Sequence, residues 1–203
     1  MGVYSERVLP RFTDIALGRP VERIRARVVA GLNGEVLEVG FGSGRNVPHY
    51  PVGVTDVAAV DPATYGRVLA ARRVAQSPVP VRYVGLDGQE LSLPDESVDS
   101  VLVTWTLCSI PDVGRALAEM HRVLRPGGAV HFIEHGRSPN VRIAKWQDRL
   151  TPLWGRIMGG CHLNRPIPEL FSASGFVVTK LRSYVGPGPE LVGYSFEGIA
   201  TKS

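Results

Sequence analysis

Residues 36–44 read Val-Leu-Glu-Val-Gly-Phe-Gly-Ser-Gly, an apolar run that passes directly into glycines at alternate positions. A short apolar run bounded by a turn is typical of a strand that is buried within a sheet. The glycines Gly40, Gly42 and Gly44 permit a tight turn and a close approach of the backbone to a ligand. A helix that started just beyond them would direct backbone N–H groups at an anionic group. The stretch therefore predicts a strand followed by a ligand-binding turn.

Strand-like and helix-like segments alternate from this stretch to the end of the chain. Apolar, β-branched runs predict strands at 35–39, 57–60, 81–84, 98–104, 129–134, 176–183 and 194–201. Apolar residues at helical spacing predict helices at 65–76 and 113–124. This alternation predicts an α/β fold: a mostly parallel sheet with helices on both faces and the ligand beyond the carboxyl ends of the strands.

Two segments lie outside the alternating pattern. Residues 8–29 predict two short helices that Gly18-Arg19-Pro20 separates, so residues 1–33 are expected to form an N-terminal helical cover. The apolar side chains expected to pack on the body are Ile15, Leu17, Ile24, Val28 and Val29. Residues 138–168 form an insertion between the fifth strand and the final pair of strands. The whole chain, residues 1–203, has the length of a single domain with one core.

Composition excludes several classes of function. The chain is 44% hydrophobic, and no run reaches the ~20 apolar residues of a membrane span. The first residues carry no signal-peptide pattern, which makes the cytoplasm the expected location. The net charge of +4 is spread along the chain and is too small to indicate nucleic-acid binding. The two cysteines, Cys108 and Cys161, have no spacing typical of a zinc site, so neither a metal nor a disulfide is expected.

Acidic residues end the next two predicted strands. Asp61 lies about 20 residues after Gly40, where a carboxylate can accept hydrogen bonds from both hydroxyls of a ribose. Asp87 follows the third strand and can accept a hydrogen bond from an adenine amino group. A dinucleotide-binding turn has the spacing G-x-G-x-x-G, whereas this chain has G-x-G-x-G and carries Arg45 where the third glycine would be. An NAD-dependent dehydrogenase is therefore disfavoured.

Four motifs together resemble one family. They are the stretch at 36–44, Val-Asp-Pro at 60–62, Leu-Pro-Asp-Glu-Ser-Val-Asp at 93–99, and Val-Leu-Arg-Pro-Gly-Gly at 123–128. On these motifs the chain, from residue 35 onwards, resembles the class I S-adenosylmethionine-dependent methyltransferases with a type 11 methyltransferase domain. The resemblance implies a Rossmann-like sheet of seven strands, with the last strand antiparallel. It also implies S-adenosylmethionine as the cofactor and S-adenosylhomocysteine as the product.

The same resemblance implies which residues bind the cofactor. The glycines of the turn lie against its methionine part, Asp61 holds its ribose, and Asp87 with Gly88 holds its adenine. Thr104 and Trp105 end the fourth strand beside the transferable methyl group. The full set of implied cofactor residues is Tyr4, Glu38, Gly40, Gly42, Gly44, Asn46, Asp61, Pro62, Asp87, Gly88, Thr104 and Trp105.

Three further segments resemble a subgroup that includes thiol S-methyltransferases of animal membranes. They are Thr-Leu-Cys-Ser-Ile at 106–110, Phe-Ile-Glu-His at 132–135, and Gly-Gly-Cys-His-Leu-Asn-Arg at 159–165. This implies a small thiol as methyl acceptor, with Cys161 and Arg165 at the acceptor pocket. The alternatives are a phosphatidylethanolamine N-methyltransferase, a quinone or phenol methyltransferase, and a non-catalytic cofactor-binding protein. The lipid alternative would use the arginine-bearing N-terminal helices for a weak contact with a membrane surface.

His135 is the candidate general base. It follows the fifth predicted strand, at the rim where the cofactor is expected, and an imidazole suits proton transfer near neutrality. A thiol of pKa about 8.5 is already partly ionised there, so a dedicated base is not required. The alternative is that His135 orders the rim through a backbone hydrogen bond. Nothing adjacent in the sequence activates either cysteine as a nucleophile, and Cys108 is expected to be a small buried residue.

Overall fold

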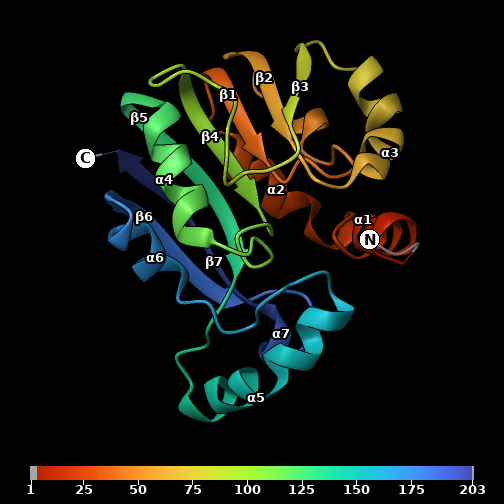
Figure 1. Ribbon diagram of the computed structural model, residues 1–203, viewed down its shortest axis with the longest axis vertical. Helices are drawn as coiled ribbons and strands as arrows, with labels where there is room; N and C mark the ends of the chain where they lie inside the picture. The colour runs from red at the N-terminus through yellow and green to blue at the C-terminus, as the bar shows by residue number, and fades with distance from the viewer. Residues whose placement is uncertain (1–3, 203) are drawn as a thin grey trace.

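The computed structural model describes residues 4–202 and is built around one seven-stranded sheet, in the order β3-β2-β1-β4-β5-β7-β6 (Figure 1). Strand β7 is antiparallel to both of its neighbours, and all other neighbouring pairs are parallel. The predicted Rossmann-like sheet with an antiparallel last strand is confirmed. The strands are β1 (Gly34–Val39), β2 (Val54–Val60), β3 (Val81–Gly85), β4 (Val98–Thr104), β5 (Leu124–His135), β6 (Phe176–Val185) and β7 (Tyr194–Lys202).

The strand order reverses at the centre of the sheet. The chain moves outward from β1 through β2 to β3 and then returns to the other side of β1, where it forms β4. Val39 at the end of β1 pairs with Val60 of β2 and with Val103 of β4, so these three strands end at one edge. In open α/β sheets a ligand binds in the crevice at such a reversal. The glycine turn that follows Val39 opens into this crevice.

Alternating side chains of the central strands supply an apolar core on each face of the sheet. Leu37 packs with Leu117 of α4 on one face, in a core that α6 completes. Val36 points to the other face and packs with Val28 of α2, while α3 covers the same face through Ala70. The helices are α1 (Leu9–Ala16), α2 (Glu22–Val29), α3 (Thr64–Ala75), α4 (Val113–Val123), α5 (Val141–Ile157), α6 (Ile167–Ala173) and α7 (Glu190–Gly193), with short helical turns at Tyr4–Val8, Arg19–Val21 and Val47–His49.

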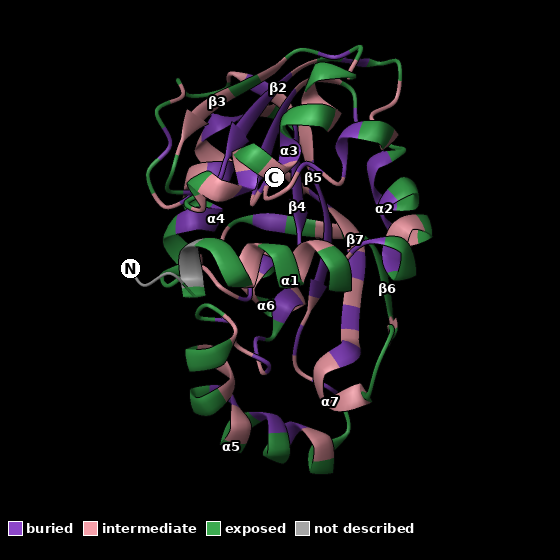
Figure 2. Ribbon diagram, turned by 90° about the vertical axis from the view of Figure 1, so that its right-hand side faces the viewer, coloured by how far each residue is buried: buried purple, intermediate pink, exposed green. Residues whose placement is uncertain are grey.

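The N-terminal cover is only partly packed on the body, and residues 1–3 of the predicted cover lie outside the described residues. Helix α2 buries Val28 and Val29, as predicted, whereas α1 buries none of its residues. Ile15 of α1 is 75% exposed, so the prediction that it packs on the sheet is wrong. Figure 2 shows much of α1 in the colour of exposed residues. The reason is that α1 is held by polar side chains such as Asp14, which leaves its apolar residues free to face outward.

Residues 138–168 form a unit that projects beyond the sheet, and its main element is α5 (Figure 1). The helix starts at Asn140, whose side chain accepts a hydrogen bond from the backbone N–H of Arg142. Gln147, which is 1% exposed, ties α5 to the end of β5. Its Oε1 accepts from the backbone N–H of Ser138 and its Nε2 donates to the carbonyl of Gly136. None of the helices that the structure describes is long and apolar enough to cross a membrane.

Candidate active site

The glycine turn after β1 leaves an open cradle. Gly40 and Gly42 have φ angles of +80° and +53°, a region that favours glycine. The backbone N–H of Gly40 donates to the carbonyl of Val60 at 2.9 Å, which fastens the turn to the end of β2. A Cβ at Gly42 would meet only the carbonyl of Gly40, at 3.9 Å. The space above Gly42 is therefore free for a ligand.

A cavity of about 230 Å³ lies above this cradle. The ends of β1, β2 and β4 form its floor, and α1 forms the opposite wall. This is the crevice that the strand order creates, and half of the residues predicted to contact the cofactor line it. Its lining consists of Thr13, Asp14, Leu17, Arg25, Gly40, Phe41, Gly42, Ser43, Arg45, Asp61, Pro62, Thr104, Trp105, Thr106 and Ser109.

Asp61 holds the turn in place from the end of β2. Its Oδ2 accepts from the backbone N–H of Gly42 at 2.7 Å, and its Oδ1 accepts from the backbone N–H of Ala63 at 2.7 Å. The side chain lines the cavity, and its burial raises the pKa of the carboxyl above its usual range. A carboxylate offers about four acceptor positions, so Asp61 retains acceptor capacity for a ligand hydroxyl.

A network of buried polar side chains supports the floor of the cavity. Asn46 donates from Nδ2 to Glu38 Oε1 at 2.9 Å and to Thr104 Oγ1 at 3.1 Å. The hydroxyl of Tyr50 donates to the other carboxylate oxygen of Glu38. Burial raises the pKa of Glu38 to about 7, although both hydrogen bonds lower it. The network places Thr104 at the cavity and leaves Glu38 and Asn46 beneath the lining.

Arg25 brings a buried positive charge to the cavity, which the sequence analysis did not predict. Its Nη1 donates to Asn46 Oδ1 at 2.8 Å and to Thr104 Oγ1 at 3.3 Å, and its guanidinium lies 4.8 Å from the centre of the Trp105 ring. It forms no ion pair with the carboxylates that the structure describes, and burial lowers its pKa to about 10. This charge suits an anionic group on the ligand.

The sequence does contain a signal for Arg25. Val21, Val28 and Val29 are buried, and a residue four positions after Val21 and three before Val28 lies on the same side of the helix. In the lipid alternative the arginines of the N-terminal helices, Arg25 and Arg27 among them, would face a membrane surface. Arg25 is 5% exposed and does not do so. Arg27 pairs with Glu197 at 2.6 Å, but its side chain is 42% exposed and remains on the surface.

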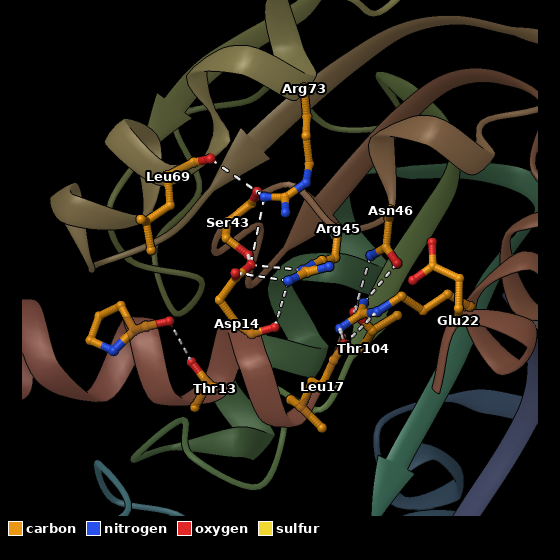
Figure 3. Close-up of polar contacts among 12 residues, drawn as sticks. Thr13, Asp14, Leu17, Glu22, Ser43, Arg45, Asn46, Leu69, Arg73 and Thr104 are labelled. Carbon is orange, nitrogen blue, oxygen red and sulfur yellow. Dashed lines mark hydrogen bonds and ion pairs between the residues drawn. The ribbon is translucent and has the colours of Figure 1, made fainter. Parts of the chain in front are cut away.

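Helix α1 is attached to the glycine turn by charged side chains (Figure 3). Asp14 accepts from Arg45 Nε at 2.7 Å and from Arg45 Nη2 at 2.8 Å, and Ser43 Oγ donates to the same carboxylate. Burial raises the pKa of Asp14, but the hydrogen bonds from Arg45 and Ser43 outweigh it, so the pKa is lowered. Arg45, which replaces the third glycine of a dinucleotide motif, thus holds α1 across the cavity.

The family model for a methyltransferase domain matches residues 37–132, which include the glycine turn and the ends of β1, β2 and β4 that form the floor of the cavity. The chain is also 34% identical over 180 residues to thiol S-methyltransferase TMT1A of Homo sapiens, which covers 85% of this chain and 73% of that protein. The chain belongs to the S-adenosylmethionine-dependent methyltransferases.

Further comparisons agree with the assignment of this methyltransferase to the family. It is 37% identical over 141 residues to thiol S-methyltransferase TMT1B of Rattus norvegicus, and the match covers 66% of this chain and 57% of that relative. The methyltransferase therefore spans less than two thirds of the length of that relative. The solved structure of an S-adenosylmethionine-dependent methyltransferase from Thermotoga maritima has a TM-score of 0.69 at 20% identity, covering 99% of this chain and 98% of that one. At that identity the likeness concerns the fold.

The cavity of the methyltransferase fits S-adenosylmethionine. The open space above Gly42 admits the methionine part, and the buried cation of Arg25 faces the same cavity, which suits a carboxylate. Bound there, the cofactor supplies a methyl group already activated by its sulfonium. Six of the predicted cofactor residues line the cavity, and Glu38, Gly44 and Asn46 lie directly behind the lining. The six are Gly40, Gly42, Asp61, Pro62, Thr104 and Trp105.

The other three predicted cofactor residues lie neither in the lining nor directly behind it. Tyr4 is 47% exposed and donates its hydroxyl to the carbonyl of Ile157 at 2.9 Å. The wall formed by α1 is lined by Thr13 and Asp14, and closure by Tyr4 remains a prediction. Asp87 is exposed and accepts from the backbone N–H and the side chain of Gln89, both at 2.8 Å. The adenine contacts of Asp87 and Gly88 remain predictions.

The predicted acceptor residues of the methyltransferase meet beside the loop that follows β4. Cys161 Sγ lies 3.0 Å from His135 Nε2, and Trp154 Nε1 donates to Cys161 Sγ at 3.3 Å. Arg165 is 8% exposed and donates to the carbonyls of Leu107 and Ile110. Arg165 therefore holds the loop, and its predicted contact with the acceptor remains a prediction, as does that of Cys161.

Cys108 is buried, as predicted, but it is not isolated. Its Sγ, Cys161 Sγ and a ring nitrogen of His135 all lie within 4.8 Å of one another. The hydrogen bond with Cys161 lowers the pKa of Cys108, and burial opposes this shift. The same hydrogen bond, together with burial, raises the pKa of Cys161, so only Cys108 has a lowered pKa, and its partners Cys161 and His135 come from distant parts of the chain. Sequence spacing did not reveal the cluster, because its members come from the loop after β4, the end of β5 and the segment after α5.

Proposed function

We propose that this methyltransferase transfers the methyl group of S-adenosylmethionine to sulfur of a small-molecule thiol. The observation that carries the proposal is the meeting of three segments beside the cofactor cavity: 106–110, 132–135 and 159–165. Arg165 joins the last segment to the first, and Cys161 joins it to His135. Relatives named as thiol S-methyltransferases, at 34–38% identity, support the same acceptor class.

The chemistry of this step requires mainly alignment and exclusion of water. Methyl transfer is an in-line displacement, so the protein must hold the acceptor lone pair opposite the methyl–sulfur bond. Helix α1 closes one side of the cavity, and the loop 105–109 closes the side toward His135. A thiol supplies a nucleophile that is partly ionised near neutral pH. When the acceptor is still in its thiol form, His135 can accept its proton, because His135 Nε2 lies beside Cys161 in the cluster of the three segments.

The experiment is methyl transfer from isotopically labelled S-adenosylmethionine to matched acceptors that differ in one atom. An alkyl thiol, the corresponding amine and the corresponding alcohol are tested with a phenol, a quinol and phosphatidylethanolamine vesicles, and mass spectrometry locates the label. We expect label on sulfur alone. Label on nitrogen, carbon or a phenolic oxygen, with none on sulfur, would refute the thiol proposal.

Two controls make the result interpretable. Asp61→Ala removes a side chain of the cofactor cavity, so any label transferred by this variant at the wild-type rate is not enzymatic. Asp56→Ala removes an exposed partner of Arg82 and should transfer as the wild type does. Binding of S-adenosylhomocysteine without transfer to any acceptor would favour the non-catalytic cofactor-binding alternative.

A second candidate is N-methylation of phosphatidylethanolamine at a membrane surface. Tyr4, Val8, Phe12 and Ile15 are 47%, 49%, 54% and 75% exposed and recur at helical spacing along the N-terminal segment. Such a stripe flanked by exposed arginines suits shallow contact with anionic lipid. A phosphatidylethanolamine N-methyltransferase of Cereibacter sphaeroides is 34% identical over 127 residues, covering 60% of this chain and 62% of that one.

Vesicle flotation tests this second candidate. Vesicles of phosphatidylethanolamine and phosphatidylglycerol should retain the wild type but not Phe12→Glu, while Val52→Glu, at an exposed loop remote from α1, should be retained. If the vesicles do not retain the wild-type protein, the lipid N-methyltransferase alternative is excluded. The contact is proposed as weak and reversible for a cytoplasmic protein, so cell fractionation should recover most of the enzyme in the soluble fraction. Recovery in the membrane fraction would contradict that location.

A further inference from the structure

The two cysteines of the chain lie at one buried place, together with a histidine. Cys108 is 2% exposed and Cys161 is 7% exposed, and with His135 they place three ligand atoms within 4.8 Å of one another. Zinc–sulfur and zinc–nitrogen bonds of about 2.3 and 2.0 Å in a tetrahedron put ligand atoms about 3.5–3.8 Å apart. Cys161 Sγ and His135 Nε2 lie 3.0 Å apart, and no pair of the three ligand atoms is separated by more than 4.8 Å, so small shifts of the side chains would suffice to bind one ion.

A second observation at the same place indicates a missing positive charge. Glu134 is 0% exposed, and its Oε2 has no hydrogen-bond partner among the described residues. Its Oε1 accepts from the backbone N–H groups of Thr106 and Leu107, at 2.7 and 3.0 Å, in the loop that carries Cys108. A buried carboxylate oxygen without a partner is costly, and a cation in the neighbouring cluster would compensate it.

We propose that Cys108, His135 and Cys161 bind one zinc ion. Two thiolates and an imidazole are ligands that zinc prefers, and they are the ligand set of one class of catalytic zinc site. The charges balance, because a divalent ion and the buried guanidinium of Arg165 offset two thiolates and the carboxylate of Glu134. Arg165 is close enough to all three groups to interact with their charges.

The surrounding hydrogen bonds already orient the ligands. Trp154 Nε1 donates to Cys161 Sγ, and the backbone N–H of His162 donates to the carbonyl of Cys108 at 2.8 Å. The hydroxyl of Ser109 lies 3.4 Å from Cys108 Sγ. Contacts of this kind fix the geometry of metal ligands and tune the bound ion. These bonds place the site without any large movement of the chain.

Three protein ligands leave the fourth position of a tetrahedral zinc ion for water or substrate. The loop that carries Cys108 also lines the cofactor cavity, through Thr106 and Ser109, so a fourth ligand would approach the ion from the side of the cofactor. This role rests on the thiol acceptor proposed above. It replaces His135 as the proton acceptor, because a ring nitrogen that binds zinc cannot take up a proton at the same time. The acceptor S–H bond breaks, its proton passes to solvent, and a sulfur–zinc bond forms, since a coordinating thiol is deprotonated. The lone pair of the thiolate then forms the new sulfur–carbon bond. The bond between the methyl group and the sulfonium breaks, and its electron pair stays on the sulfur of S-adenosylhomocysteine.

Metal content of the purified full chain, after loading with zinc chloride and removal of excess ion, tests the site directly. We expect about one zinc per chain, and a loss to background in Cys108→Ser, Cys161→Ser and His135→Ala. His121→Ala is the matched control, because His121 is a partly buried histidine at the edge of Phe176, outside the cluster, and should retain one zinc. Zinc that stays bound in all three ligand variants would overturn the site.

Cobalt and thiol reactivity give readouts that do not depend on catalysis. Cobalt(II) should produce a thiolate-to-metal absorption band in the wild type and in His121→Ala, and no band in either cysteine variant. Because the chain has two cysteines, a thiol reagent reports on this cluster alone. Both thiols should react slowly with zinc bound and faster after a chelator. The proposal would be refuted if both thiols reacted freely and cobalt(II) gave no absorption band. It would also be refuted if the two cysteines formed a disulfide and the protein bound no metal.

The failure of the site and the failure of the proposed function give different results. A zinc-free enzyme that methylates thiols at the full rate would remove the metal proposal and leave thiol methylation intact. Stoichiometric zinc together with transfer only to an amine or a lipid would keep the metal site and remove the thiol acceptor.

Discussion

Asp61 and Arg25 present opposite charges to the same cavity, and each has a different task. Asp61 holds the glycine turn through the N–H of Gly42 and keeps acceptor positions for a ribose, whereas Arg25 suits the carboxylate of the cofactor. Glu38 lies beneath the floor of the cavity. Burial, and not contact with a ligand, raises the pKa of its carboxyl to about 7. These side chains can therefore be tested separately.

Asp61→Ala should weaken binding of S-adenosylhomocysteine by about 1–3 kcal/mol, the size of a lost hydrogen-bond partner that carries charge. Isothermal titration calorimetry measures the change, with Asp56→Ala as the control. Wild-type affinity in Asp61→Ala would mean that the ribose lies elsewhere.

Arg25→Met should weaken binding of S-adenosylhomocysteine by about 1.5–3 kcal/mol, because it removes a cation that faces the carboxylate of the ligand. Binding of 5′-methylthioadenosine, which lacks that carboxylate, should change little in the same variant. Arg23→Met, at an exposed position of the same helix, should leave both affinities unchanged. An equal loss for both ligands would show that Arg25 acts only on the structure of the cavity.

Glu38 predicts a pH dependence of stability. Burial raises its pKa from 4.5 to about 7, so between these values the folded state binds the proton more tightly than the unfolded state. The free energy of unfolding should therefore fall as the pH rises through this window, by up to about 3 kcal/mol from this group. Denaturant unfolding of Glu38→Gln should show a smaller decline, because Glu134 and Asp61, whose pKa values burial also raises, still contribute. Parallel pH profiles for the two proteins would contradict the assignment.

At the scale of elements, α1 is the least firmly packed helix beside the cavity. It buries no residue and is joined to the glycine turn through Asp14, Ser43 and Arg45. Its exposed apolar residues do not contribute to this attachment. We therefore expect α1 to be the wall that opens when the cofactor enters or leaves, since elements with few buried contacts open most easily.

Asp14→Ala should loosen this wall. The contact is a partly exposed ion pair, so its loss should cost about 0.5–1 kcal/mol and speed dissociation of S-adenosylhomocysteine about two- to fivefold. Stopped-flow displacement measures the rate, and the effect should shrink at high salt because screening already weakens the pair. Asp148→Ala removes an exposed pair with Arg137 away from the cavity and should not alter the rate. An unchanged rate in Asp14→Ala would mean that α1 does not gate the cavity.

At the scale of the molecule, the cavity joins the N-terminal helices to the ends of β1, β2 and β4, so a bound ligand stabilises the fold as a whole. S-adenosylhomocysteine at a hundred times its Kd should stabilise the protein by about 2.7 kcal/mol. For a domain of this size that corresponds to a rise in Tm of about 5–11 °C. NAD at the same concentration should leave Tm unchanged, and a comparable shift with NAD would contradict the cofactor assignment.

The sheet, the glycine turn and the cofactor class follow from patterns within short stretches of the chain. Strand burial, turn glycines and the acidic residue after β2 are local features, so seven strands and Asp61 could be predicted from them. The bounds were less accurate, because β5 begins at Leu124 and not at residue 129. Ile15 shows the limit of such patterns, because apolar spacing indicates one face of a helix but not whether another element covers it. Arg25 was predictable in principle, from its position among buried valines.

Contacts between distant segments needed the folded chain. The Asp14–Arg45 attachment, the cation of Arg25 at the cavity, and the cluster of Cys108, His135 and Cys161 each join residues from different elements. No spacing rule encodes these pairs, because the strand order and the path of the insertion after β5 decide which loops meet at the carboxyl edge. Local sequence thus specifies the elements and the cofactor site, whereas packing of the whole chain determines how the cavity closes and what surrounds the acceptor.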